Sequence, residues 1–231
     1  MRVSVVGLGP GPLDWITPAA RSKLRSPGAR VFVRTRLFPG LDGLLEGLAW
    51  ESFDTVYETA TSLVEVHAEI LQRVLSGGDE VVLAVPGDGV IGEAILTGLV
   101  AAGASVEVVP GVPLGAGALA ASGVAASNGA QVVEATSLDG RGVELVIELN
   151  PRWAGVVTGI YSPRVASDLK LALLRVYPAE HAVHVVRHPG SSDQQVASMK
   201  LSELDRSAVA LDHLTHLVLP PVVGYTPTGS S

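Results

Sequence analysis

The sequence contains no cysteine, and this absence excludes a thiol nucleophile, a disulfide bond and a thiolate metal site. It also fits a reducing compartment. Aromatic residues make up only 4% of the chain, so few rings are present on which nucleic acid bases could stack. Lysine and arginine form no run, and the formal net charge is −7. We therefore expect no nucleic acid partner, because the basic surface that binds phosphate backbones is missing.

Long apolar runs are missing as well. No uninterrupted apolar stretch reaches the roughly 18 residues that span a membrane. The chain enters a strand-like segment directly after Met1, without the basic and apolar regions of a secretory signal. Hydrophobic residues nevertheless make up 47% of the 231 residues and charged residues only 17%, which is enough apolar surface for a large core. We expect a soluble, cytoplasmic protein with one large domain or two modest ones and no membrane partner.

The first half of the chain alternates apolar strand-like runs with helix-like segments. We expect strands at Arg2–Val6, Ala29–Val33, Trp50–Phe53, Glu80–Val85 and Ser105–Val109, helices at Thr17–Ser26, Ser62–Leu75 and Ile91–Ala102, and a short helix within Phe38–Gly47. Alternation of this kind implies right-handed crossovers and a mostly parallel sheet.

The second half has shorter strands and shorter connections. We expect strands at Gln131–Ala135, Val143–Leu149, Gly155–Ile160, Ala182–Val186, Ala197–Leu201 and Leu217–Leu219, and helices at Leu114–Ala121 and Arg164–Val176. Hairpin-length loops favour a mixed or antiparallel sheet. The sequence thus predicts an α/β protein with an N-terminal domain at 1–112, a C-terminal mixed α/β domain at 113–224 and a tail at 225–231.

Three of the N-terminal strands end in glycine turns. The sequence reads Gly9-Pro10-Gly11 after the first strand, Pro86-Gly87-Asp88-Gly89 after the fourth and Pro110-Gly111-Val112-Pro113 after the fifth. Because parallel strands place their carboxyl ends at one edge, we expect the three turns to line a single ligand crevice. Asp88 stands between two glycines, and we interpret it as a ligand contact in preference to a simple turn acid.

Two common glycine motifs do not fit this chain. The third glycine of a dinucleotide fingerprint would fall at Pro12, and the next helix start, Thr17, lies too far along for its N-terminus to face a pyrophosphate. A phosphate-binding P-loop needs the string GxxxxGK followed by Ser or Thr, which the sequence lacks. We therefore expect neither a dehydrogenase of that type nor a P-loop kinase or GTPase.

The strings VVGLGPG, AVPGDG and VVPGV resemble the tetrapyrrole methylase family of S-adenosylmethionine-dependent enzymes. The strings GVVTGIYSPRVASDLKLALLRVYPAEHAVHVVRHPG and DHLTHLVLPP are similar to the methylase-like N-terminal domain of MazG-type nucleotide pyrophosphohydrolases. Together these strings cover almost the whole chain, in the expected order.

The resemblance implies that S-adenosylmethionine, or S-adenosylhomocysteine, binds in a cleft between two α/β domains. It implies no metal, because the sulfonium is itself the activated electrophile, and it implies a small-molecule methyl acceptor and a homodimer. It assigns Gly9 and Pro10 to the floor of the cleft, and Asp88, Gly89, Val90 and Ile91 to the methionine portion. It assigns Pro113 and Leu114 to the domain junction, Ile160 and Tyr161 to the adenine, and His188 with Pro189 to a closing loop.

The chain departs from the family pattern at several positions. Pro12 replaces an acid in the first turn, and Pro113 replaces a hydroxyl-bearing residue at the junction. In the porphyrinogen methylases an acid follows the second strand and precedes an Arg-Leu pair, and here that position is Thr35. The adenine loop reads Ile160-Tyr161-Ser162. These losses argue against a standard uroporphyrinogen or precorrin methylase, and we assign no catalytic residue.

Two other functions stay open. The MazG hydrolase reaction uses ExxE and ExxD segments to hold Mg²⁺, and although Glu51 and Asp54 have the second spacing, no ExxE precedes them. Glu65 and Glu69 are interpreted as a solvated helix face. Hydrolase activity would therefore belong to a C-terminal MazG-type domain outside this chain. The remaining alternative is a non-catalytic or regulatory module.

The histidines are interpreted as structural. His181 and His184 point to opposite sides of a strand, so they do not form a shared metal site with His188. His213 and His216 are expected at the surface or in an interface.

Overall fold

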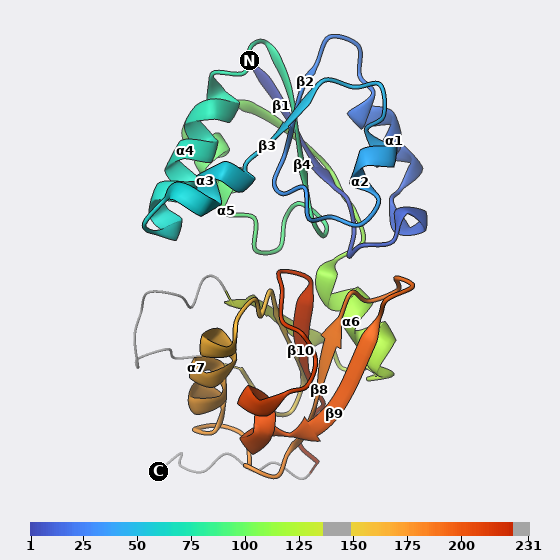
Figure 1. Cartoon of the computed structure of the whole chain (residues 1–231), viewed down its shortest axis with the longest axis vertical. Coiled ribbons are helices and arrows are strands. Elements are labelled where there is room, and N and C mark those ends of the chain that lie inside the picture. Colours follow the sequence, from blue (N-terminus) through green and yellow to red (C-terminus); the bar gives the residue numbers. More distant parts are fainter. Residues whose placement is uncertain (136–148, 224–231) are drawn as a thin grey trace. The chain divides into compact units, whose positions relative to one another are not determined.

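A computed structural model describes residues 1–135 and 149–223, and the chain divides into two compact units between Leu114 and Gly115 (Figure 1). Unit 1 comprises Met1–Leu114 and contains a parallel sheet with the strand order β3-β2-β4-β1-β5. Its strands are β1 (Arg2–Gly7), β2 (Arg30–Val33), β3 (Trp50–Ser52), β4 (Glu80–Val85) and β5 (Ser105–Val109). Its helices are η1 (Leu13–Trp15), α1 (Pro18–Leu24), α2 (Leu41–Leu44), α3 (Asp54–Thr59), α4 (Leu63–Leu75) and α5 (Ala94–Ala101).

Both faces of this sheet are covered, which is why its strands read as continuous apolar runs rather than alternating ones. Figure 1 shows α1 and α2 on one side and α3, α4 and α5 on the other. Val6 and Val33 pack toward α1 and α2, whereas Val5 and Phe32 pack toward the opposite helices. Thr17 caps α1 by accepting a hydrogen bond from the Ala20 N–H, as the sequence predicts.

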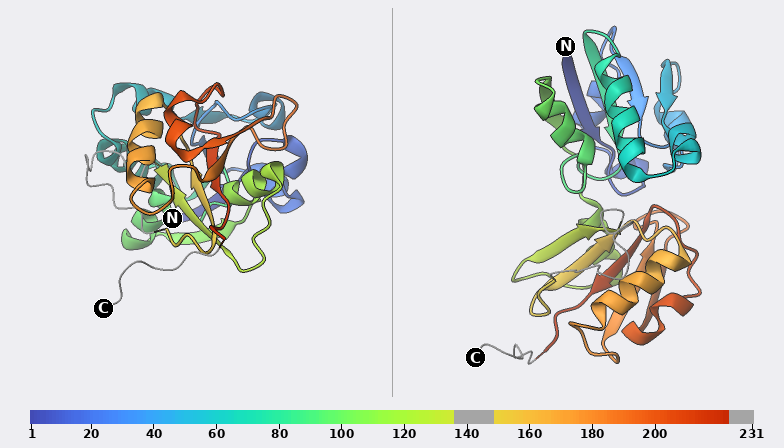
Figure 2. Two further views of the ribbon diagram at one scale, coloured as in Figure 1. Left: turned by 90° about the horizontal axis from the view of Figure 1, so that it is seen from below. Right: turned by 90° about the vertical axis from the view of Figure 1, so that its left-hand side faces the viewer.

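Unit 2 contains the strand order β6-β7-β10-β8-β9 within the described residues. The strands are β6 (Ala130–Glu134), β7 (Ala154–Thr158), β8 (Ala182–Arg187), β9 (Gln195–Lys200) and β10 (Thr215–Leu219), and the helices are α6 (Leu114–Ser122), α7 (Pro163–Leu173) and η4 (Leu201–Arg206). β6 and β7 are parallel and the other pairs are antiparallel. Val157 and Leu217 belong to the core under α7, which lies across one sheet face in the right panel of Figure 2, and Val218 packs with Ala118 of α6.

The α/β class, the parallel first sheet and the mixed second sheet agree with the sequence prediction. Among the described residues, three short helices were not expected, namely η1, α3 and η4. The expected helix at Ile91–Ala102 begins only at Ala94, because a loop held by Asp88 comes first. The strand expected at Val143–Leu149 lies outside the described residues except for Leu149, which is in no strand. Within the described part of the chain, no helix is long and apolar enough to cross a membrane.

Candidate functional site

The three glycine turns of unit 1 meet through their backbones. The Gly9 N–H donates to the Gly87 carbonyl at 2.9 Å, and the Gly87 N–H donates back to the Gly9 carbonyl at 2.8 Å. The Gly111 N–H donates to the Asp88 carbonyl at 3.4 Å. The turns after β1, β4 and β5 therefore form one edge, as the sequence predicts. We call the contiguous segments Gly7–Gly11, Pro86–Gly89 and Pro110–Pro113 the glycine edge.

Glycine is required at this edge for two physical reasons. A Cβ on Gly7 would lie 2.5 Å from the Gly111 nitrogen, and a Cβ on Gly111 would lie 2.4 Å from the Gly87 oxygen. Such approaches are far below normal contact distances and involve main-chain atoms that cannot rotate away. Gly9, Gly87 and Gly89 adopt φ values of 81°, 78° and 81°, in the left-handed region that disfavours side chains. The edge is thus a surface of main-chain groups.

Asp88 has the structural role of a turn acid, the alternative that the sequence analysis ranked below a ligand contact. Its side chain is buried, and its Oδ1 accepts hydrogen bonds from the backbone N–H groups of Val90 at 2.6 Å and Ile91 at 2.8 Å. An aspartate that bonds the N–H groups two and three residues ahead fixes a tight turn. Asp88 therefore shapes the loop between β4 and α5.

The loop that Asp88 holds exposes apolar side chains. Val90 is 53% exposed and Ile91 is 54% exposed, directly after three buried residues of the glycine edge. Pro10 and Gly89 are buried, Pro113 and Leu114 are half-buried, and Leu114 lies against Gly87. The residues assigned from the first half of the sequence thus cluster around the Gly87 turn. Val90 and Ile91 are the exposed side chains of this cluster, and a bound ligand could cover them.

A buried ion pair fixes the far end of the same loop. The Arg34 guanidinium donates to Glu93 Oε1 at 2.8 Å, with the two side chains only 14% and 9% exposed. Arg34 also donates through Nε to the Tyr57 hydroxyl, and Glu93 caps α5 by accepting from the Ile95 N–H at 2.9 Å. β2, α3 and α5 are thereby linked at the carboxyl end of the sheet. The sequence analysis did not predict these contacts, because Arg34, Tyr57 and Glu93 are far apart in the sequence and form no motif.

Thr35, where the porphyrinogen methylases carry an acid, is bonded to an acid from another element. Its hydroxyl donates to Asp54 Oδ1 at 2.6 Å, and the Arg36 backbone N–H donates to Asp54 Oδ2 at 2.9 Å. Burial raises the pKa of Asp54, but the hydrogen bonds from Thr35, Arg36 and Ser52 outweigh it, so the pKa lies below its ordinary value. A carboxylate is therefore present beside position 35, supplied by the start of α3.

In unit 2 the assigned residues converge on one segment, Asp212–Thr215. The Ile160 N–H donates to the Thr215 carbonyl at 2.8 Å. The Tyr161 ring stacks on the His213 ring with centroids 5.6 Å apart. The backbone N–H of His188, which precedes the buried Pro189, donates to the Leu214 carbonyl at 3.0 Å. The structure thus brings Ile160, Tyr161 and Pro189 to the loop before β10, which the sequence analysis did not include in the site.

Asp212 organises this segment. Its Oδ1 accepts from the Leu214 N–H at 2.9 Å, and its Oδ2 accepts from Arg187 Nε at 2.8 Å and contacts His188 Nε2 at 2.8 Å. Burial raises the pKa of Asp212, but the Arg187 hydrogen bond and the nearby His188 reverse the effect, and the pKa lies below its ordinary value. The sequence feature that could have indicated this role is Asp212 itself, which precedes a histidine in the string DHLTH.

The surface placement expected for His216 is wrong. His216 is fully buried on β10, opposite Val186 of β8, and neither ring nitrogen has a hydrogen-bond partner among the described residues. Burial lowers the pKa of His216 to about 4, with Asp212 acting in the opposite direction. A neutral imidazole on a central strand packs like an apolar side chain. The sequence alone does not distinguish a buried neutral histidine from an exposed one. His213 is exposed, as expected.

The two carboxylates with the ExxD spacing of MazG hydrolases contact other side chains of the chain. Glu51 is paired with Arg30 at 2.6 Å, and Asp54 accepts from Thr35. Across the described residues, no group of three His, Asp or Glu side chains is arranged to hold a metal ion.

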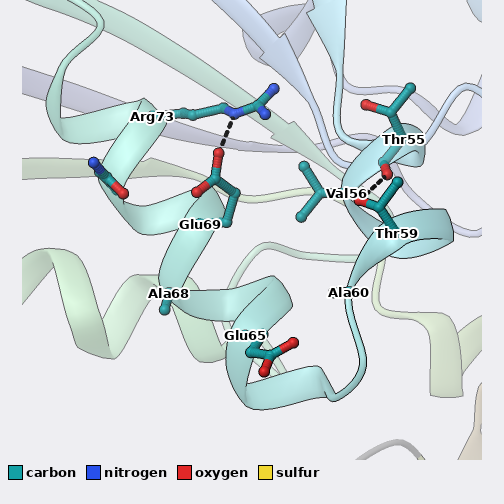
Figure 3. Close-up of a pocket in the computed structure, with 9 residues that line it drawn as sticks. Thr55, Val56, Thr59, Ala60, Glu65, Ala68, Glu69 and Arg73 are labelled. Carbon is teal, nitrogen blue, oxygen red and sulfur yellow. Dashed lines mark hydrogen bonds and ion pairs between the residues drawn. The ribbon is translucent and has the colours of Figure 1, made fainter.

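A groove of about 590 Å³ lies between α3 and α4, away from the residues assigned by sequence. Figure 3 shows the Glu69–Arg73 ion pair of α4 on one side of it and Thr55 and Thr59 of α3 on the other. Glu65, which also lines the groove, accepts two hydrogen bonds from Thr61. None of its lining residues belongs to the glycine edge, and we assign no function to this groove.

The chain is a two-unit α/β protein, with a parallel sheet and its glycine edge in unit 1 and a mixed sheet in unit 2. The family described as Tetrapyrrole (Corrin/Porphyrin) Methylases matches residues 2–205. The chain is a member of this family.

The chain is also similar to a curated protein and, in fold, to solved structures. The chain is 30% identical over 232 residues to the uncharacterized protein YabN of Bacillus subtilis (strain 168), covering 96% of this chain and 45% of that protein, so it spans about half the length of the curated relative. The structure is similar to uroporphyrin-III-C-methyltransferase from Thermus thermophilus, with a TM-score of 0.69, 24% identity and 96% of each chain covered. A structure of that enzyme complexed with S-adenyl homocysteine has a TM-score of 0.65 at 22% identity, covering 95% of this chain and 97% of the other.

Proposed function

We propose that the chain is an S-adenosylmethionine-dependent methyltransferase that acts on a small-molecule acceptor. The observation that carries the proposal is the glycine edge, where main-chain groups of Gly9, Gly87 and Gly111 meet beside the exposed Val90 and Ile91. The N–H groups of these glycines are occupied by hydrogen bonds within the edge. Each carbonyl oxygen has a second lone pair, so the edge can accept hydrogen bonds from the amino group of a small ligand without a charged side chain.

The proposed contacts follow the family positions. In unit 1, Gly9 and Pro10 are assigned to the floor of the site, Asp88, Gly89, Val90 and Ile91 to the methionine portion, and Pro113 and Leu114 to the junction positions. In unit 2, Ile160 and Tyr161 are assigned to the adenine and Pro189 to the closing loop. Two observations support the assignment. Seven of the unit 1 residues belong to, or directly follow, turns that touch one another, and the unit 2 residues share the Asp212–Thr215 segment. The residues of each group therefore lie close to one another within one unit.

The residues fit the cofactor chemically. The cofactor supplies a methyl group already activated on a sulfonium, so the protein needs no metal and no covalent nucleophile. The glycine edge would bind the amino acid portion, and Asp88 would hold the Val90–Ile91 loop against it. Apolar side chains at this loop would exclude water from the methyl group, and the whole arrangement would orient the acceptor for direct displacement. The acceptor itself is not identified by these residues.

Calorimetric titration with S-adenosylhomocysteine and S-adenosylmethionine tests the proposal. We expect wild-type protein to bind both and Asp88→Ala to bind roughly tenfold more weakly, because two loop hydrogen bonds are lost. Asp88→Asn keeps an acceptor oxygen and should retain most of the affinity. Asp42→Asn, at an exposed site on α2, is the matched control and should bind like wild type. No heat at about millimolar ligand, the weak limit of small-ligand affinity, would overturn the proposal.

A second candidate is a regulatory methylase-like module of a MazG-type pyrophosphohydrolase. It is supported by coverage, because the match takes in 96% of this chain but only 45% of the relative. The discriminating observation is whether the natural reading frame continues past Ser231 into a helical, carboxylate-rich segment, and whether that longer protein releases pyrophosphate from nucleoside triphosphates. In either case, we propose a cytoplasmic homodimer.

A further inference from the structure

The imidazole of His188 lies between two carboxylates. Its Nδ1 is 2.7 Å from Asp193 Oδ2, and its Nε2 is 2.8 Å from Asp212 Oδ2. Both distances are those of charge-assisted hydrogen bonds. A neutral imidazole carries one N–H donor and one lone pair, so it can satisfy only one carboxylate. Two carboxylate partners therefore require the imidazolium form, provided that both acids are ionised.

The surroundings keep both acids ionised. Hydrogen bonds from Ser191 and His188 lower the pKa of Asp193, and the Arg187 hydrogen bond and His188 lower the pKa of Asp212 against the effect of burial. Arg187 contacts both acids, at 2.8 Å to Asp212 and 3.7 Å to Asp193. His216 lies behind Asp212 on β10, and its pKa of about 4 keeps it neutral near pH 7.

The backbone at His188 also needs the side-chain contacts. Its φ is 49°, in the left-handed region that non-glycine residues rarely adopt. The carbonyl of His188 accepts from the Ser191 hydroxyl at 2.7 Å and from the Ser191 N–H at 3.1 Å, which closes the turn containing Pro189. The two carboxylates hold the ring, and the ring holds this turn to the loop before β10.

The same loop also positions Ile160, which is assigned to the adenine. Asp212 Oδ1 accepts from the Leu214 N–H at 2.9 Å and from the Thr215 hydroxyl at 3.1 Å, and the Thr215 carbonyl accepts from the Ile160 N–H. The His188–Asp212 contact is therefore connected to the Pro189 turn through His188 and to Ile160 through Thr215.

We infer that His188 is a positioning residue whose ring fastens the Pro189 turn to Asp212, and that cofactor affinity depends on this contact. The inference rests on the proposed function, because it assigns a role in the same site. Removal of the ring would release both carboxylates and loosen the turn. Affinity for S-adenosylhomocysteine should accordingly fall when the ring is removed.

Titration calorimetry with S-adenosylhomocysteine is the test. His188→Gly should bind roughly tenfold more weakly than wild type, the effect of one charge-assisted hydrogen bond. The glycine variant accepts the left-handed backbone, so it separates loss of the imidazole from backbone strain. His188→Gln keeps an amide donor that can reach a carboxylate and should recover part of the affinity. Wild-type affinity in His188→Gly would overturn the inference.

Two further measurements separate this inference from the proposed function. His184→Gln replaces an imidazole bonded to Ser198 on β9, outside the site, and should keep the wild-type affinity. Hydrogen exchange without ligand reports on the His188 N–H, which bonds the Leu214 carbonyl, and on the Leu214 N–H, which bonds Asp212. Exchange at both groups should accelerate in His188→Gly and stay unchanged in His184→Gln. If wild type fails to bind, the proposed function fails, and unchanged exchange in His188→Gly would overturn this inference by itself.

Discussion

The buried imidazole of His216 makes the stability of unit 2 depend on pH. Its pKa is about 4 in the folded protein, against an ordinary value of 6.5. Below pH 6.5 the unfolded chain takes up a proton that the folded chain does not, so stability falls as the pH drops from 6.5 toward 4. At pH 5 the loss should be about 2 kcal/mol relative to pH 7.5.

Urea unfolding at both pH values measures this loss. His216→Leu removes the titrating group and two unpaired ring nitrogens, so it should be neutral or stabilising at pH 7.5 and should abolish about 2 kcal/mol of the acid destabilisation. If the leucine variant loses as much stability as wild type at pH 5, the acid sensitivity belongs to other groups. Asp54 and Asp212, whose pKa values are lowered, would add to the loss only as the pH falls below the ordinary carboxylate range.

The glycine edge gives a second prediction at the residue scale. Gly7→Ala places a methyl group 2.5 Å from the Gly111 nitrogen, and the main chain must move to make room. We expect a loss of about 3 kcal/mol in the free energy of unfolding. Gly43→Ala is the matched control, because a Cβ at Gly43 in α2 meets nothing within 4 Å, and alanine is the better helix former. Equal effects of the two substitutions would contradict the close packing of the turns.

At the scale of elements, the Arg34–Glu93 pair joins β2 to the start of α5. Because both side chains are nearly buried, removing one partner should cost about 3 kcal/mol, as in Glu93→Gln or Arg34→Met. In the double mutant the two losses should not add, and a double-mutant cycle by urea unfolding measures the coupling. The Glu69–Arg73 pair on α4 is 41% and 43% exposed, so Arg73→Gln should change stability by less than about 0.5 kcal/mol.

The elements also show which information the sequence carries. Buried parallel strands such as Glu80–Val85 were predicted with their bounds, because a continuous apolar run between glycine signals has few alternatives. Three strand ends with glycine turns were enough to predict the glycine edge. The short helix α3 and the late start of α5 were missed, since both depend on contacts made by Asp54 and Asp88 in the folded chain. The Asp212 segment was missed for the same reason.

At the scale of the whole molecule, each hydrophobic core belongs to one unit. The clusters that contain Val6 and Val5 lie within unit 1, and those that contain Leu217 and Val218 lie within unit 2, among the residues that the structure describes. A local defect should therefore destabilise one unit more than the other. Hydrogen exchange of Gly7→Ala should accelerate in β1 and β4 while β7, β8 and β10 exchange as in wild type. Equal acceleration in both units would show that the two units unfold as one cooperative block.

The glycine edge has a consequence for anything designed to bind there. Its contact surface is main chain, and Gly7 and Gly111 leave no room even for a methyl group. An inhibitor that made its principal hydrogen bonds to this edge would meet atoms that a single-residue change cannot replace without damaging the fold. Escape variants would have to arise among the flanking side chains, such as Val90 and Ile91, so an inhibitor anchored on the edge alone should be slow to select resistance.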